Sequence, residues 1–276
     1  DDIRAIVKDR HGNLWFIGEL QPYRYNPRTG AIHTNPGYPS ATSLCQSADG
    51  DIWIASPEGQ IAKYDETTDS FTRWPLFDHS PRPSSTWTTK MMAIGQDTIW
   101  VGTTSQGIKM FNTRLHTYQD ILPYNNEHTE TYVRDFIHRA ADEYWIATES
   151  GIFIYHLSTG EYVNLQKKYN DPYSISDNAV YTLCQDKEGG IWAGTYFGGV
   201  NYFAAPYTSF EKFFPRTGEN SLGGNAIREI CPDKYGQLWI GSEDGGLNKM
   251  DIRSGKITNF RPSPAGGGLS HTNIHG

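Results

Sequence analysis

Positions 233–242 read Asp233-Lys234-Tyr235-Gly236-Gln237-Leu238-Trp239-Ile240-Gly241-Ser242, and Gly245-Gly246-Leu247-Asn248 follows. The same order of a turn, an apolar run and a glycine turn recurs over residues 186–201. The tryptophan of this pattern recurs along the chain at intervals of 38, 47, 45, 47 and 47 residues, as Trp15, Trp53, Trp100, Trp145, Trp192 and Trp239. A fixed period of roughly 40–50 residues is typical of a repeat protein.

Each repeat reads as four short strands separated by turns. In the fifth repeat, residues 180–185, 191–195 and 200–203 are β-rich runs, and residues 210–214 are the expected fourth strand. Four antiparallel strands per period predict one blade of a β-propeller. A solenoid, the rival architecture, would show shorter repeats or regular helices.

We therefore predict an all-β fold, a β-propeller of four-stranded antiparallel blades with about six blades present. Residues 269–276 look like the start of a further blade, so we expect the chain to be part of a seven-bladed ring or of a double-propeller array. The chain, 1–276, is then one propeller domain whose approximate blades are 1–39, 40–86, 87–130, 131–177, 178–224 and 225–268.

The charge balance and the hydropathy pattern exclude two classes of function. Of 276 residues, 31 are acidic and 24 are basic, which gives a net charge of −7. This balance disfavours a nucleic-acid surface, because such a surface needs Lys and Arg to neutralise phosphate. No apolar run approaches the roughly 18–20 residues of a membrane span, and no signal peptide is visible, so any targeting segment is expected outside this chain.

The three cysteines share one position in the repeat. Cys45, Cys184 and Cys231 each precede their tryptophan by eight residues, and two other repeats have Val or Ile at that spacing. We expect a hairpin about two residues shorter in the third repeat, with Ile94 at the matching place. A position filled by Val, Ile or Cys is typical of a buried strand, so we predict buried free thiols.

The repeat pattern, Asp-x-x-Gly-x-Leu/Ile-Trp-x-Gly-Thr followed by Gly-Gly-Leu/Val-Asn, resembles the two-component-regulator propeller repeats. These occur in the periplasmic sensor domain of Bacteroides-type hybrid two-component system histidine kinases. Residues 170–178 and 269–276 also look typical of that family. The resemblance covers all six repeats; it is strong in the fifth and sixth and weaker in the first and third.

This resemblance implies a sensor. Such proteins usually carry two seven-bladed propellers, a small β-sandwich, a membrane helix, a histidine kinase and a DNA-binding response regulator. They generally sense oligosaccharides and switch on genes of carbohydrate utilisation. The chain would then be a periplasmic, non-enzymatic module with an oligosaccharide ligand and no cofactor. It would dimerise through its parent protein, contact no nucleic acid itself, and reach the membrane only through segments outside this chain.

One repeat position varies where a scaffold residue would be constant. Eleven residues before the tryptophan, at the expected mouth of the central channel, the repeats have Arg4, Thr42, Arg134, Tyr181 and Arg228, and the third repeat offers Met91. Arginine forks can hold carboxylate, sulfate or sugar hydroxyls. The alternative is ion pairing between blades with nearby acids such as Glu130, Asp135 and Glu229.

Aromatic and acidic residues are expected on the same face. Trp87 follows the Ser84-Ser85-Thr86 loop, and Tyr196 and Phe197 lie between a second and a third strand. Exposed rings can stack on sugars, although loop packing or a partner contact would explain Trp87 as well. The polar candidates on this face are Glu149, Glu243 and Asp244.

The signals for catalysis and for a metal are poor. His271 and His275 are four residues apart, but on an expected strand, and no Gly-x-Ser-x-Gly motif is present. We therefore predict no catalytic and no metal residues. Two alternatives to a sensor stay open: a structural or dimerisation propeller without a small ligand, and an enzyme such as a streptogramin-lyase-like protein or a glycoside hydrolase.

Overall fold

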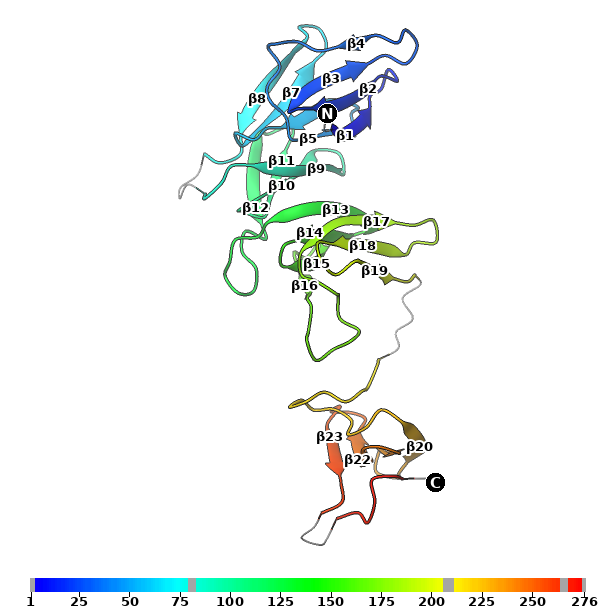
Figure 1. Cartoon of the computed structure of the whole chain (residues 1–276). Coiled ribbons are helices and arrows are strands. Elements are labelled where there is room, and N and C mark those ends of the chain that lie inside the picture. Colours follow the sequence, from blue (N-terminus) through cyan, green and yellow to red (C-terminus); the bar gives the residue numbers. More distant parts are fainter. Residues whose placement is uncertain (1–2, 79–82, 206–210, 264–267, 275–276) are drawn as a thin grey trace. The chain divides into compact units, whose positions relative to one another are not determined.

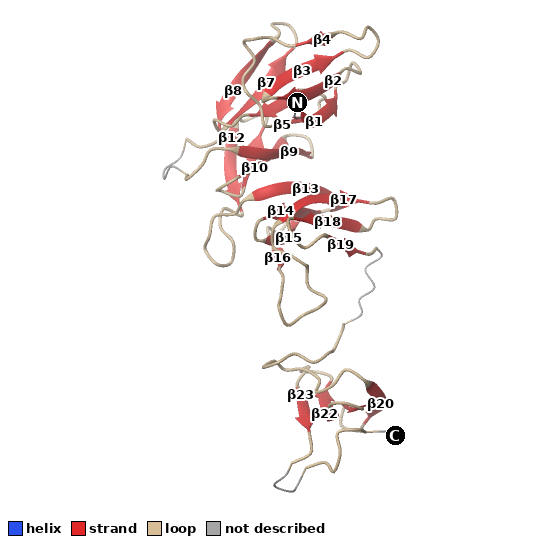
Figure 2. Cartoon of the chain, viewed as in Figure 1, coloured by secondary structure: helices blue, strands red, loops and turns tan. Residues whose placement is uncertain are grey.

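The computed structural model describes residues 3–78, 83–205, 211–263 and 268–274 (Figure 1). All regular secondary structure in these ranges is β-strand (Figure 2), and they contain no helix that could cross a membrane. The chain divides into two units, one comprising Asp1–Lys167 with Ser174–Pro206 and the other Lys168–Tyr173 with Tyr207–Gly276. Each unit is described by itself.

Among the described residues, the first unit contains four sheets of four strands and one of three, all antiparallel and in chain order. The strands of the first two sheets are β1 (Ile3–Lys8), β2 (Leu14–Gly18), β3 (Gln21–Tyr25), β4 (Ile32–His33), β5 (Ser43–Gln46), β6 (Ile52–Ala55), β7 (Gln60–Asp65) and β8 (Ser70–Pro75). Those of the next three are β9 (Thr88–Ile94), β10 (Thr98–Thr103), β11 (Ile108–Asn112), β12 (Thr117–Ile121), β13 (Val133–Ala140), β14 (Glu143–Thr148), β15 (Gly151–His156), β16 (Tyr162–Leu165), β17 (Val180–Gln185), β18 (Ile191–Thr195) and β19 (Val200–Phe203).

The second unit contains one antiparallel sheet of four strands within its described part. Its strands are β20 (Ile227–Pro232), β21 (Gln237–Ser242), β22 (Gly246–Asp251) and β23 (Ile257–Phe260). The prediction of an all-β chain built from successive antiparallel sheets is confirmed.

The first strands of the first unit follow one another in space. β1 contacts β5, β5 contacts β9, β9 contacts β13, and β13 contacts β17. The tryptophans Trp15, Trp53, Trp100 and Trp145 lie between these sheets and are at most 1% exposed. Gly102 shows how closely the sheets approach, because a Cβ there would lie only 2.8 Å from Cγ1 of Val133 on the next sheet.

Polar side chains also tie the first strands together. Oγ of Ser43 accepts a hydrogen bond from the backbone N of Met91 at 2.9 Å. Oδ2 of Asp135 accepts one from the backbone N of Leu183 at 3.0 Å, and Oδ1 of Asp135 pairs with Nζ of Lys90 at 3.1 Å. Asp135 therefore links three successive sheets, although its cation is a lysine and not one of the mouth arginines.

The strand register corrects our alignment of the third repeat. In every sheet the second-strand tryptophan faces the residue eight positions earlier, and for Trp100 that residue is Met92. The expected shortening of this hairpin, with Ile94 in that place, is therefore wrong. The hairpin keeps its length, because β9 and β10 run on to the pair Ile94–Thr98. The residue eleven before Trp100 is thus Thr89, and Met91 is buried in the core.

The expected fourth strand of the fifth repeat, residues 210–214, differs from the structure. Phe210 lies outside the described residues, and residues 211–214 form no strand. Phe214 instead packs against Tyr173 in the second unit, with ring centroids 5.2 Å apart.

The prediction of buried cysteines holds for one of the three. Cys45 is buried and free as predicted, but Cys184 and Cys231 are exposed. The reason is that, among the described residues, neither of the sheets that hold them is followed by a further sheet of the same unit.

Residues after β23 return to their own sheet, where they contact the end of β21 and the start of β22. The backbone N of Gly246 donates to O of Thr272 at 2.8 Å, as the N of Gly151 donates to O of Asn178 at 2.7 Å. The backbone N of Ile274 donates to O of Ser242 at 3.0 Å. The last described residues therefore contact their sheet in the way that the segment before β17 contacts the fourth sheet; His275 and Gly276 lie outside the described residues.

Candidate functional site

The repeat position eleven residues before the tryptophan, which we expected at the mouth of the central channel, lies in a β-bulge. Val133 pairs with Thr148 and Asp135 with Ala147, so Arg134 is an extra residue in its strand. The same irregularity falls at Tyr181 in β17 and at Arg228 in β20. A bulge turns a side chain away from the regular alternation of the strand. These side chains are therefore free of the packed sheet faces, and Arg4 lies in the corresponding irregularity of β1.

Arg134 is held by a carboxylate and by two tyrosine rings. Its Nε donates to Oε1 of Glu149 at 2.7 Å, and its Nη2 donates to the hydroxyl of Tyr181 at 3.0 Å. Its guanidinium carbon lies 3.9 Å from the ring centroid of Tyr132 and 4.1 Å from that of Tyr181. Cation–π contacts and the ion pair thus fix the orientation of the guanidinium.

The aromatic residues of the β18–β19 loop continue this arrangement. The rings of Tyr181 and Tyr196 are stacked at 5.2 Å and 15°, and Tyr196 meets Phe197 edge-on at 4.3 Å. The backbone N of Phe197 donates to Oδ2 of Asp177 at 2.9 Å, which anchors the loop. Tyr196 is 59% and Phe197 87% exposed. We call Arg134, Glu149, Tyr181, Tyr196 and Phe197 the mouth group.

The charges around Tyr181 in the mouth group keep its phenol protonated. Desolvation and the nearby charge of Glu149 raise the pKa of Tyr181, and Arg134 opposes this only in part. Tyr181 therefore stays neutral at physiological pH and keeps a hydroxyl hydrogen to donate. The group thus offers an open aromatic surface beside an ionised donor–acceptor pair.

The second unit repeats part of this pattern by itself. Nε of Arg228 donates to Oε2 of Glu243 at 2.8 Å, fifteen residues along the chain, as Arg134 does to Glu149. Asp244 instead accepts backbone hydrogen bonds from Asn225 and Ala226, at 3.1 and 3.2 Å. These bonds lower the pKa of Asp244 and assign its carboxylate to shaping the turn.

Trp87 occupies the same place in the third sheet as Tyr132 in the fourth. The backbone O of Trp87 accepts from N of Thr104 at 3.0 Å, and that of Tyr132 accepts from N of Glu149 at 3.1 Å. Within the described part of the chain, Trp87 has neither a hydrogen bond nor a ring contact with the mouth group. Within the first unit, the structure therefore brings together five of the predicted residues, and Trp87 is not one of them. Arg228, Glu243 and Asp244 belong to the second unit and are described only there.

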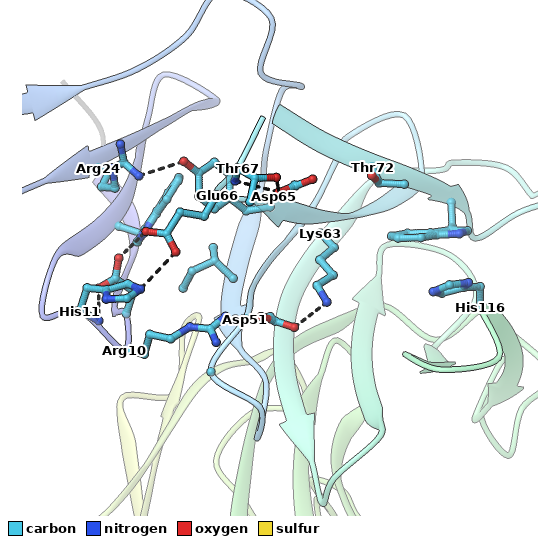
Figure 3. Close-up of a pocket in the computed structure, with 16 residues that line it drawn as sticks. Arg10, His11, Arg24, Asp51, Lys63, Asp65, Glu66, Thr67, Thr72 and His116 are labelled. Atoms are coloured by element: carbon cyan, nitrogen blue, oxygen red, sulfur yellow. Dashed lines mark hydrogen bonds and ion pairs between the residues drawn. The ribbon is translucent and has the colours of Figure 1, made fainter. Parts of the chain in front are cut away.

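The structure has a cavity of about 510 Å³ that the sequence did not indicate (Figure 3). It lies in the first three sheets, at the strand ends that are joined by the β1–β2, β5–β6, β7–β8 and β11–β12 turns. Its walls come from the turns that join the first to the second strand and the third to the fourth. Arg10, Asp51, Lys63 and His116 are among the residues that line it. One sequence signal could have led to it, since Trp74 in its wall lies outside the tryptophan period.

Comparison with known proteins supports the resemblance seen in the sequence. The two-component regulator propeller family matches residues 174–197 and 221–244. No curated protein matches the sequence. A solved extracellular domain assigned to the hybrid two-component system BT3049 of B. thetaiotaomicron is 24% identical, with a TM-score of 0.69 over 93% of this chain and 34% of that one.

Two other solved structures have a similar fold. An extracellular domain assigned to the hybrid two-component system BT4673 of B. thetaiotaomicron is 18% identical, with a TM-score of 0.61 over 94% of this chain and 36% of that one. A streptogramin B lyase is 15% identical, with a TM-score of 0.50 over 95% of this chain and 83% of that one.

The chain thus spans about a third of the length of the two B. thetaiotaomicron domains. At these identities the likeness shows the fold. Two segments of the chain, in the fifth and sixth repeats where the sequence resemblance is strongest, therefore match the two-component regulator propeller family, and the chain has a β-propeller fold that is also found in extracellular domains of hybrid two-component systems.

Proposed function

We propose that this chain is a periplasmic sensor module of a hybrid two-component protein and that it binds an oligosaccharide at the mouth group. The parent histidine kinase would then regulate genes of carbohydrate utilisation. The observation that carries the proposal is the stack of Tyr181, Tyr196 and Phe197 beside the Arg134–Glu149 pair. The repeats and the fold shared with extracellular two-component domains support a sensing role.

The chemistry of the mouth group suits a sugar. The axial C–H groups of a pyranose make an apolar face that packs on an aromatic ring, and Phe197 and Tyr196 offer such rings to solvent. Sugar hydroxyls both donate and accept hydrogen bonds. A guanidinium with five N–H donors beside a carboxylate can satisfy both, and charge-assisted bonds of this kind are the stronger ones.

The proposal involves no reaction at this site. A glycosidase needs two carboxyl groups that flank the scissile bond, whereas Glu149 is already engaged by Arg134. The likeness to a streptogramin B lyase is one of fold and carries no activity to this chain. Signalling requires instead that the ligand favour one arrangement of the parent protein over another, for example within a dimer.

A thermal-shift screen of the chain against an oligosaccharide panel tests the proposal. One class of oligosaccharide raises the unfolding temperature, because a ligand that binds only the folded state stabilises it by mass action. Tyr196→Ala and Phe197→Ala abolish that shift. Tyr235→Ala, which removes an exposed aromatic ring from the β20–β21 turn, serves as the matched control and retains it.

Three outcomes would contradict the proposal. If no oligosaccharide of the panel changes the unfolding temperature and the chain forms a concentration-dependent dimer, the structural alternative is favoured. A shift that survives both aromatic substitutions places the ligand elsewhere. Conversion of an oligosaccharide into products during incubation indicates an enzyme.

A further inference from the structure

The loop between β18 and β19 carries the exposed rings of Tyr196 and Phe197, and a carboxylate from another segment holds this loop. Oδ2 of Asp177 accepts a hydrogen bond from the backbone N of Phe197 at 2.9 Å, and Oδ1 of Asp177 accepts one from the backbone N of Ala179 at 3.3 Å. The backbone N of Tyr196 donates to O of Ala179 at 2.9 Å. The loop is thus bonded, through Asp177 and Ala179, to the segment that leads into β17.

In the second unit, the corresponding loop between β21 and β22 is held by a carboxylate of its own. Oδ2 and Oδ1 of Asp244 accept hydrogen bonds from the backbone N of Asn225 and of Ala226, at 3.1 and 3.2 Å. The backbone N of Glu243 donates to O of Ala226 at 2.8 Å, which is the same backbone bond as in the fifth sheet. The two loops therefore share this bond and differ in which partner supplies the carboxylate.

The sequence shows that the two arrangements are exchanged versions of each other. The segments that lead into the first strands read Asp177-Asn178-Ala179 and Gly224-Asn225-Ala226, and the loops read Tyr196-Phe197-Gly198-Gly199 and Glu243-Asp244-Gly245-Gly246. The aspartate thus lies in the leading segment of the fifth repeat and in the loop of the sixth. Where the loop has no aspartate, it has a phenylalanine.

The second unit has room for only one anchoring side chain at this pair of positions. A Cβ at Gly224 would lie 2.2 Å from Oδ1 of Asp244 and 2.6 Å from the backbone N of Gly245. In the fifth sheet the anchor is Asp177, so position 197 needs no polar side chain. Its ring is left to solvent, since Phe197 is 87% exposed.

Two other sheets of the first unit show that this loop position usually makes the bond itself. In the third sheet, Oγ of Ser105 donates to O of Ser85 at 2.7 Å, and in the fourth, Oγ of Ser150 accepts from Nδ2 of Asn125 at 2.9 Å. Both serines lie five residues after the tryptophan of their repeat, as Phe197 does. An aromatic residue at this position therefore depends on an anchor from outside the loop.

The anchoring carboxylate is ionised at neutral pH. The bond from the backbone N of Phe197, with those from Ala179 and Asn178 and the charge of Lys167, outweighs desolvation and lowers the pKa of Asp177. Hydrogen bonds to an ionised acceptor are roughly twice as strong as neutral ones. Loss of Asp177 should therefore loosen the loop.

We propose that Asp177 is the positioning residue of the mouth group. Its carboxylate takes over the anchoring that the loop residue performs in other sheets, and this frees position 197 for an aromatic ring that meets the ligand. The same anchor holds Tyr196 in its stack on Tyr181. The ligand contact rests on the proposed function, whereas the anchoring of the loop does not.

Hydrogen–deuterium exchange of the unliganded chain, followed by mass spectrometry, tests the anchor. In Asp177→Ala, the peptide that contains Tyr196 takes up deuterium about 10- to 100-fold faster than in the wild type, as expected when hydrogen bonds to a charged group are lost. Peptides from β13, β14 and β15 keep their wild-type rates. The matched control is Glu188→Ala, which removes an exposed acid from the β17–β18 turn at the other end of β18 and leaves the loop rate unchanged.

Moving the anchor separates positioning from a general effect on stability. Asp177→Gly combined with Phe197→Asp builds the arrangement of the second unit in the fifth sheet, where the same Asn-Ala pair offers its N–H groups. This double variant restores the slow exchange of the loop. It does not restore affinity for the oligosaccharide that gives the largest thermal shift, because the ring is absent. Asp177→Ala lowers that affinity about tenfold or more, although both rings are present.

Three results would overturn the anchor. They are unchanged loop exchange in Asp177→Ala, equally accelerated exchange in β13, β14 and β15 with a lowered unfolding temperature, and fast loop exchange in the double variant. A loop that loosens in Asp177→Ala while the affinity stays the same would reject the positioning role and leave the proposed function standing. If no oligosaccharide of the panel binds, the proposed function and the ligand contact both fall, and the exchange rates still decide the anchor.

Discussion

Nε1 of Trp192 donates a hydrogen bond to Oδ2 of Asp186, six residues earlier, at 2.9 Å. The same bond joins Trp15 to Asp9 and Trp239 to Asp233, each at 3.0 Å. The turn aspartate thus does more than shape its hairpin, because it also satisfies the indole of the repeating tryptophan. Among the described residues, the indole nitrogens of Trp53 and Trp100 are buried without a partner.

This relationship predicts a stabilising substitution in the second sheet. Ser47 lies six residues before Trp53, at the place where three other repeats have aspartate. Ser47→Asp should let a carboxylate accept from the buried Nε1 and raise the free energy of unfolding by about 1 kcal/mol. Urea unfolding measures the change. Ala48→Asp adds the same charge at an exposed neighbour, and equal effects of the two substitutions would refute the explanation.

Lys109 is a charged side chain buried in the third sheet. It is 1% exposed, and its Nζ donates to Oε1 of Gln106 at 2.7 Å and to Oδ1 of Asp120 at 2.6 Å. Asp120→Ala leaves the buried ammonium short of its counter-charge and should cost about 3–5 kcal/mol. Lys109→Met should cost clearly less, because Asp120 is partly exposed to water. Chemical unfolding of the two variants that gave the reverse order would contradict this account.

The hydrogen bonds of Asp69 should make the free energy of unfolding sensitive to acid. Partial burial raises the pKa of Asp69, but hydrogen bonds from Tyr38 at 2.5 Å and Tyr64 at 2.7 Å, with His33 and Asn35, outweigh it and hold the pKa well below its ordinary value of 3.8. A depressed folded pKa contributes stability that is present above the unfolded pKa and is lost as the pH falls through the folded one.

The free energy of unfolding should therefore fall below about pH 4, and more steeply in the wild type than in Asp69→Asn. Unfolding measured at several pH values checks this slope. Asp49→Asn, at an exposed turn position, is the control and should keep the wild-type slope. Parallel curves for wild type and Asp69→Asn would show that this network does not set the acid limit.

Arg134→Lys separates recognition from stability at the mouth group. A lysine keeps the charge but cannot lie flat between Tyr132 and Tyr181 or bond Glu149 through two nitrogens. We expect oligosaccharide affinity to fall about tenfold or more, while stability changes by less than about 1 kcal/mol, as is usual for a partly exposed ion pair. Titration and thermal unfolding of the same preparation test both parts, and unchanged affinity would remove Arg134 from the binding site.

Most of the fold could be predicted from the repeat, because burial between sheets requires the same pattern of apolar residues in every blade. The spacing of eight between each tryptophan and its partner holds in all six sheets, and our error at Ile94 came from departing from it. The exposure of Cys184 could not be predicted in this way, because it depends on which faces of a sheet are covered and not on the repeat.

The candidate site was accessible to sequence reasoning only in part. The spacing placed Arg134 and Tyr181 at one repeat position, since a bulge recurs there. It could not show that the two side chains contact each other, which needs the distance between neighbouring strands. The cavity of Figure 3 was missed for a similar reason. Arg10 lies in a turn of the first sheet, Lys63 in β7 of the second and His116 in a turn of the third, and only the packing of the sheets brings them together.

The crystal structure of the chain with the oligosaccharide that stabilises it most is the direct test of the mouth group as a sensor site. The account predicts a sugar ring against Tyr196 or Phe197, with a hydroxyl bonded to Arg134 or Glu149. A sugar bound elsewhere, with none of these four side chains in contact with it, would contradict it.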